Sequence, residues 1–180
     1  KARSNRLLEE QVLRILFQEP YSLNELNKTL GLLRVPQFGE DDFVESDFRQ
    51  AYQVVLNSIR QDQLSPVDYI AENLPDLFIS DESAAMIEKV KPVTEQKRLA
   101  DLVRTALRIK RSHLDSRVQE ILFLQTEMEE KHYTAEEAEV LLTELIVQRR
   151  TLDEAMKSKL SGGDGVEERL PRHKLGIKGK

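Results

Sequence analysis

The chain has 180 residues, of which 33% are charged and 6% aromatic, and its formal net charge is −5. It contains no Cys, which excludes disulfide bonds and thiolate metal sites and fits a cytosolic protein. No apolar run approaches the roughly 18 residues that a membrane span needs. The first residue is Lys rather than Met, so we expect a piece of a longer protein.

Short amphipathic helices are predicted for the N-terminal part. Apolar residues at helical spacing predict a first helix over about 7–19, which ends before Pro20. Ser22 and Glu25 then predict a capping box for a second helix. Gly31 predicts the end of that helix, because glycine is the residue that most often follows a helix C-terminus.

A loop with apolar anchors follows over residues 31–45, and the anchors are Phe38 and Phe43. The acids in the sequence GEDDFVESD, residues 39–47, are expected to be solvated or to lie at a helix start. Further helices are predicted from Ser46 or Asp47 to about residue 61, from the cap Ser65 to Leu74, and over about 81–90.

The helices predicted for the C-terminal part are longer than those of the N-terminal part. Residues 95–131 contain neither Pro nor Gly and predict one helix of about 55 Å. Thr134 and Glu137 predict a capping box for a last helix that runs to about Leu160. The short connection makes the two helices antiparallel. The last residues, 161–180, are rich in Gly, Lys and Arg and are expected to form a flexible tail.

The apolar face of the long helix changes direction midway. Its first half carries Leu99, Leu102, Val103, Ala106 and Leu107 on one face. That face then meets the polar residues Lys110, His113 and Arg117, beyond which a rotated face carries Leu114, Val118, Ile121 and Met128. A change of packing partner explains the rotation, from the N-terminal bundle to the last helix.

We therefore expect an all-α protein in which a compact helical bundle lobe is followed by a long helix and a projecting C-terminal antiparallel helical hairpin. The expected units are the lobe over 1–111, the hairpin over 112–160 and the tail over 161–180. Whether the long helix is continuous or bent near 110–117 stays open at this stage.

Sequence motifs for catalysis are absent. The patterns for phosphate-binding loops, hydrolase nucleophiles, zinc proteases and calcium loops do not occur. The three His residues have no second His or Cys at metal-ligand spacing. We predict no catalytic, cofactor-binding or metal-binding residues, and we expect a binding or regulatory module.

A basic stripe on the long helix, formed by Arg104, Arg108 and Arg111, is the first candidate for contacts. Asp101 and Asp115 lie three or four residues away, so a solvated helix face is the favoured interpretation. Docking of a protein comes second. Direct nucleic-acid binding is least favoured, because the rest of the chain is acidic.

Apolar residues of the hairpin that lie off its internal seam are the second candidate. They form a predicted partner-binding surface of Phe123, Leu124, Met128, Tyr133, Leu142, Ile146 and Val147. The alternative is that the hairpin folds back and buries these side chains against the lobe.

Three segments carry a family resemblance by their order and spacing: EEQVLRILFQEP, then FRQAYQVVLNSI ahead of SPVDYIAENL, then RLADLVRTALRIKRSHLDSRVQEI. Over about residues 5–160 the chain resembles the C-terminal, helicase-binding region of bacterial DNA primase of the DnaG type. The resemblance implies that the hairpin docks on the N-terminal domains of the hexameric replicative helicase. It also implies that the lobe modulates the helicase during RNA primer synthesis at the cytoplasmic replication fork.

The chemistry that this resemblance implies belongs to the parent protein, a DNA-directed RNA polymerase and hence a nucleotidyltransferase. A zinc-binding domain and a polymerase core that uses a divalent metal ion would lie upstream of this chain. For the chain itself we expect no enzyme activity, cofactor, small-molecule substrate or membrane partner. The alternative is an unrelated helical adaptor or scaffold domain that binds another protein.

Overall fold

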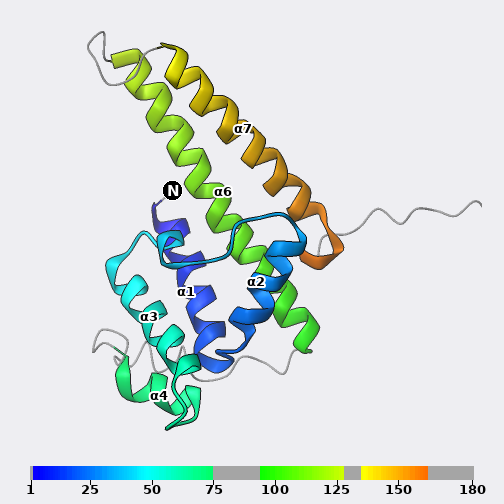
Figure 1. The fold of residues 1–180 in the computed structure, drawn as a ribbon. Coiled ribbons are helices and arrows are strands. Elements are labelled where there is room, and N and C mark those ends of the chain that lie inside the picture. Colours follow the sequence, from blue (N-terminus) through cyan, green and yellow to red (C-terminus); the bar gives the residue numbers. More distant parts are fainter. Residues whose placement is uncertain (1, 75–93, 128–134, 162–180) are drawn as a thin grey trace, which may run out of the picture.

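The computed structural model describes residues 2–74, 94–127 and 135–161 (Figure 1). These residues form α-helices and short 3-10 helices without any β-strand, so the described part of the protein is all-α. The α-helices are α1 (Ala2–Gln18), α2 (Ser22–Leu32), α3 (Ser46–Arg60), α4 (Pro66–Asn73), α6 (Glu95–Glu127) and α7 (Ala135–Lys157). The 3-10 helices are η1 (Glu40–Asp42) and η3 (Lys159–Ser161).

The main hydrophobic core joins α1, α2, α3, α4 and the first half of α6. The predicted apolar face of the first half of α6 points into it, since the residues of that face from Leu102 to Leu107 are buried and Leu99 packs against the cluster. Its fully buried side chains include Leu13, Leu16, Leu26, Leu30, Ile70, Leu102 and Leu107. Burying a side chain of this size stabilises the fold by about 1.5–3 kcal/mol, which explains why the helical spacing of these residues predicts the packing.

The start of α2 differs from the predicted capping box. Ser22 is the first helical residue rather than the cap, and its hydroxyl donates a hydrogen bond of 2.6 Å to the carbonyl of Glu19. Tyr21 stands at the cap position in a helical conformation and makes no side-chain cap. The chain turns so tightly after Pro20 that Ser22 faces the end of α1 instead of the start of α2.

The end of α2 also differs from the prediction. Gly31 is still helical, and the residue with left-handed backbone is Arg34, with φ of 59°. The amides of Arg34 and Val35 donate to the carbonyls of Gly31 and Leu30, which is the Schellman pattern of helix termination. Val35 is buried beside Leu30 in the core, so apolar packing sets the helix end one turn later than glycine predicts.

The starts of the next two helices agree with the sequence. α3 begins at Ser46. Ser65 caps α4, since its hydroxyl oxygen accepts a hydrogen bond of 3.2 Å from the amide of Asp68, and Pro66 occupies the first turn. The helix predicted over 81–90, the capping residue Thr134 and the tail beyond residue 161 lie outside the described residues.

The long helix α6 is continuous through residues 110–117 and contacts different neighbours along its length. Its first half packs on α1 and α2, while its second half runs antiparallel beside α7, away from the other helices (Figure 1). Ile121 is buried with Ala138 and Leu145 of α7 in a second, smaller cluster. Leu114 contacts both clusters and marks the place where the neighbour changes.

The base of α7 belongs to the main core. Leu152 and Ala155 are buried together with residues of the N-terminal helices, and Met156 packs against the same cluster. The C-terminal end of α7 is therefore continuous with the core that α1 to α4 build.

Candidate docking surface

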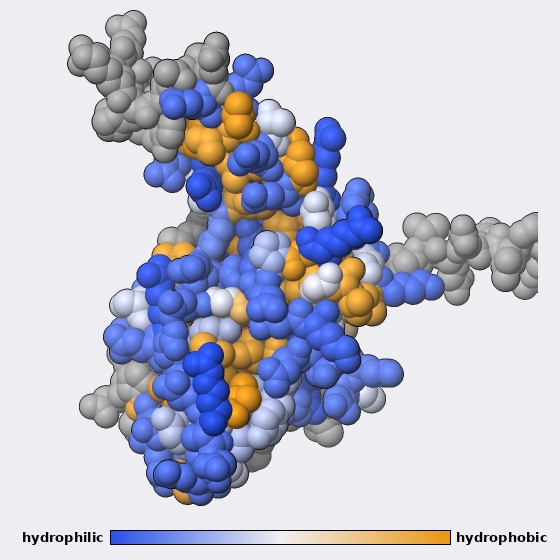
Figure 2. Space-filling model, in the orientation of Figure 1, coloured by the Kyte–Doolittle hydropathy of each residue, from blue (hydrophilic) through white to orange (hydrophobic). Residues whose placement is uncertain are grey.

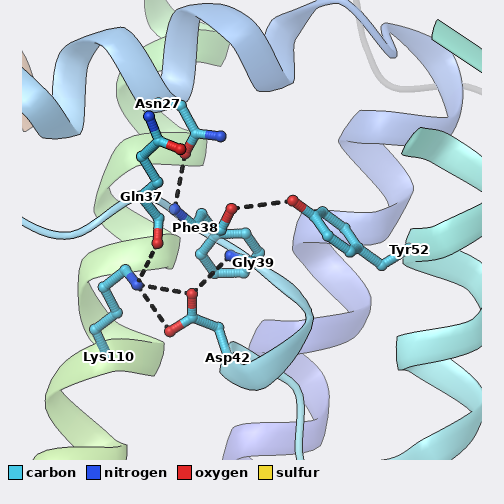
Figure 3. A network of polar contacts seen from close by, with 7 residues as sticks. All are labelled: Asn27, Gln37, Phe38, Gly39, Asp42, Tyr52 and Lys110. Carbon is cyan, nitrogen blue, oxygen red and sulfur yellow. Dashed lines mark hydrogen bonds and ion pairs between the residues drawn. The ribbon is translucent and has the colours of Figure 1, made fainter. Parts of the chain in front are cut away.

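A polar network fixes the loop between α2 and α3 to α6 at the point where α6 leaves the main core (Figure 3). The Lys110 ammonium donates to both carboxylate oxygens of Asp42, at 2.9 and 2.7 Å, and to the carbonyl of Gln37 at 3.0 Å. The side chains of Lys110 and Asp42 are only 11% and 13% exposed. Lys110 therefore acts as an internal anchor, although its position in the helix pattern predicts a solvated interruption.

The acids of residues 39–47 were expected to be solvated or to lie at a helix start, but the side chain of Asp42 is nearly buried. Besides binding Lys110, its carboxylate accepts a hydrogen bond of 2.9 Å from the amide of Gly39. The acid thus closes the 3-10 turn η1 and holds the turn against α6 at the same time. One buried carboxylate binds both the Lys110 ammonium and the Gly39 amide. The loop therefore has one defined position beside the long helix.

Aromatic packing and two further hydrogen bonds complete this anchor. The ring centroids of Phe38 and Phe43 lie 5.3 Å apart, and those of Phe43 and Tyr52 also lie 5.3 Å apart. The carbonyl of Phe38 accepts from the Tyr52 hydroxyl at 3.0 Å, and its amide donates to the Asn27 side chain at 2.7 Å. Burial raises the pKa of Tyr52 to about 12, so its hydroxyl stays protonated as a donor.

A fully buried carboxylate on α1 holds the last residues of the same loop. Oε2 of Glu9 accepts a hydrogen bond of 3.2 Å from the amide of Val44. Burial raises the pKa of Glu9. The loop is therefore held by contacts with α1, α2, α3 and α6 at the place where α6 leaves the main core.

Ion pairs on one flank link α6 to α7. Arg111 contacts Asp153 at 2.5 Å, and Arg149 contacts Asp115 at 3.6 Å. Asp115 lies four residues from Arg111 and contacts Arg149 of α7, because α7 lies beside this part of α6. Of the predicted basic stripe, Arg104 and Arg108 are exposed, whereas Arg111 is half-buried in its ion pair.

Exposed apolar side chains occupy the same two helices beyond the main core, and Figure 2 shows apolar surface along this projection. Among the described residues they are Leu122, Phe123, Val140, Ile146 and Val147, with exposed fractions from 46% to 59%. Large apolar side chains on a surface increase affinity for a partner that can cover them. The parts of α6 and α7 beyond the main core therefore expose several large apolar side chains that a partner could contact.

The structure describes the side chains of four of the seven predicted partner-binding residues. Phe123, Ile146 and Val147 are exposed, while Leu142 is half-buried against the smaller cluster. Leu124 lies within α6, but the structure describes no side-chain position for it, and Met128 and Tyr133 lie outside the described residues. Sequence reasoning missed Leu122 and Val140, although Val140 precedes Val147 by two helical turns and shares its face.

Helical spacing and the ion pairs show which exposed residues share a flank. On α7, Leu142 and Ile146 continue the line of Arg149 and Asp153, whose ion pairs border α6. On α6, Leu122 continues the line of Arg111 and Asp115. Leu122, Leu142 and Ile146 therefore lie on one flank of the two helices, which we name the Ile146 flank.

The opposite flank contains a groove of about 400 Å³, which we name the junction groove. Its walls come from residues 34–36, from α6 between Lys110 and Arg117, and from α7 between Val147 and Leu152. His113 lies in the wall and is half-buried, with its Nε2 atom buried and without a hydrogen-bond partner. Burial lowers the pKa of His113, so the ring is neutral at neutral pH. No sequence signal pointed to this groove.

Two further kinds of feature, metal-binding clusters and membrane-spanning helices, are absent from the part of the molecule that the structure describes. Within it, no cluster of three or more His, Cys, Asp or Glu residues is arranged to hold a metal ion. None of the described helices combines the length and the apolar character needed to cross a membrane. Comparisons with protein-family models, with curated proteins and with solved structures found no match for this chain.

Proposed function

We propose that this chain is a non-catalytic docking module in which residues up to about 111 form a lobe and residues 112–160 a projecting hairpin that binds a protein partner. The observation that carries the proposal is the set of exposed apolar side chains on the described part of the hairpin, with Ile146 on one flank and Val147 on the other. The anchored base supports it, because a rigid projection loses little conformational entropy when it binds.

The partner that we propose is the hexameric replicative helicase, contacted through its N-terminal domains. This choice rests on the resemblance to the C-terminal region of bacterial DNA primase, and the chain would then recruit primase to the helicase and modulate it. An all-α module with an apolar projection is compatible with that role. Direct binding of nucleic acid through the basic stripe is less favoured, because Arg111 is already paired with Asp153.

Substitutions on the hairpin test the docking surface. Ile146→Ser and Val147→Ser remove exposed apolar side chains and leave both buried clusters intact. We expect each to weaken binding to the helicase N-terminal domains about tenfold, as measured by isothermal titration calorimetry, because central apolar contacts contribute above 1 kcal/mol each.

Val44→Ser and Val67→Ser are matched controls. Both valines are exposed but lie outside the hairpin, and we expect their substitution to leave the affinity unchanged. Equal affinity of the hairpin variants and the wild-type chain would contradict the docking surface. Wild-type chain that co-purifies from cell extract with a different protein, and not with the helicase, would favour the alternative of an unrelated adaptor.

A further inference from the structure

The junction groove has the size of a small-molecule site. Its volume of about 400 Å³ lies within the range of roughly 300–1,000 Å³ that is usual for ligand pockets. Val35, Leu114 and Leu152 provide apolar walls from three separate segments of the chain. Ligand pockets commonly combine such walls with a few polar groups that fix the orientation of the ligand.

Two arginines give the groove its charge. Arg34 and Arg117 both line it, both are exposed, and neither forms an ion pair with any described residue. The other cation in the wall, Lys110, is occupied by Asp42. The two charges of this buried pair compensate each other, so the guanidinium groups of Arg34 and Arg117 leave the groove with a positive charge that favours an anion.

The backbone of Arg34 adds an independent observation. Its φ of 59° lies in the left-handed region, where a residue with a Cβ atom costs about 1–2 kcal/mol. Glycine is the common residue at this position of a Schellman motif. The chain instead carries an arginine there, and that arginine lines the groove. A strained residue that brings a charge to a cavity indicates a role for the charge.

We propose that the junction groove binds a small amphiphilic anion, in which a carboxylate, sulfonate or phosphate is joined to an apolar body. Arg34 and Arg117 bind the anionic group, and Val35, Leu114 and Leu152 contact the apolar body. This proposal does not depend on the identity of the docking partner.

Binding in the groove would affect the whole base of the hairpin. Such a ligand contacts the segment after α2, the middle of α6 and the lower part of α7 at the same time. A ligand that binds only the assembled elements raises the free energy of unfolding. Because Val147 lines the groove and is also exposed on the hairpin, bound ligand would change the surface that a partner meets.

The test uses 1-anilinonaphthalene-8-sulfonate, a dye that joins a sulfonate to an apolar aromatic body, in a fluorescence titration of the full chain. We expect saturable binding with one site per chain. Arg34→Gln and Arg117→Gln should each weaken it about tenfold, because a charge-assisted hydrogen bond contributes about 1.5–3 kcal/mol. Amide chemical-shift changes should fall within residues 33–36, 110–117 and 147–152.

Arg108→Gln is the matched control, since Arg108 is an exposed arginine of the same helix that does not line the groove, and we expect unchanged binding. Equal dye affinity in the Arg34 and Arg117 variants would overturn the proposal, as would shift changes confined to other segments. An oligodeoxythymidine of twelve nucleotides and a decaglutamate peptide serve as competitors of the dye. If either binds through the same two arginines more tightly than the dye, the groove is a macromolecular site and the small-anion proposal is wrong.

Discussion

At the scale of single residues, the pair of Lys110 and Asp42 is the contact on which the position of the loop depends most. Lys110→Met leaves the carboxylate of Asp42 in a nearly buried site without its cation. We expect a loss of about 3 kcal/mol in the free energy of unfolding, measured by urea denaturation, since breaking a buried pair costs roughly 3–5 kcal/mol. Lys97→Met, at an exposed position of the same helix, should change stability by less than about 0.5 kcal/mol. Similar small effects for both variants would show that the network does not anchor the loop.

The lowered pKa of His113 predicts how the free energy of unfolding depends on pH. Burial is the largest cause of its lowered pKa, with Lys110 and Arg49 acting in the same direction and Asp42 opposing them. The unfolded chain binds the proton of His113 more tightly than the folded chain does. The contribution of His113 to stability is therefore complete above the ordinary histidine pKa of 6.5 and decreases as the pH falls through 6.5 towards the lowered pKa of the folded state. We expect the wild-type chain to lose more stability between pH 7.5 and pH 5.5 than the His113→Gln variant does. Parallel losses in the two proteins would contradict this origin.

Substitution of Arg34 should affect the free energy of unfolding and the affinity for the dye in opposite directions. Arg34→Gly relieves the left-handed backbone strain and should raise the free energy of unfolding by about 0.5 kcal/mol, after the larger entropy of the unfolded glycine chain is subtracted. The same variant should weaken dye binding in the junction groove about tenfold, as Arg34→Gln does. A clear drop in the melting temperature would show instead that the arginine side chain stabilises the fold.

At the scale of the helices, the difference between predicted and observed ends has a physical cause. The spacing of apolar residues predicts which face is buried, and this holds for α1, α3 and the first half of α6. Helix ends depend on contacts between distant segments, and the burial of Val35 carries α2 past Gly31. The sequence alone therefore predicts the faces of the helices better than their ends.

The smaller cluster between α6 and α7 allows a test of how independent the hairpin is. Leu145→Ala removes a buried side chain from a cluster with few other members, and such changes cost about 2–5 kcal/mol. We expect faster hydrogen exchange at amides of residues 115–123 and 138–150, with unchanged protection in α1 and α3. A uniform loss of protection in all helices would show that the hairpin and the main core unfold as one unit.

At the scale of the whole molecule, the sequence predicted the all-α character of the described residues and three of the apolar side chains that α6 and α7 expose, namely Phe123, Ile146 and Val147. It did not predict the anchored base, because Lys110 and Asp42 are 68 residues apart and each resembles an ordinary solvated charge in its own segment. It also did not predict the junction groove, whose walls come from three distant segments. Apolar spacing along the long helix predicted its change of packing neighbour from the N-terminal helices to α7. The polar contacts and the groove between distant segments carry no such periodic signal and were not predictable.

The most direct test of the docking function is hydrogen–deuterium exchange of the wild-type chain with and without the N-terminal domains of the replicative helicase. The proposed function predicts that bound helicase slows exchange in α7 between residues 138 and 150 and in the facing part of α6, while α1, α3 and α4 keep their free rates. Slowed exchange confined to α1, α3 and α4, with the hairpin unchanged, would contradict it.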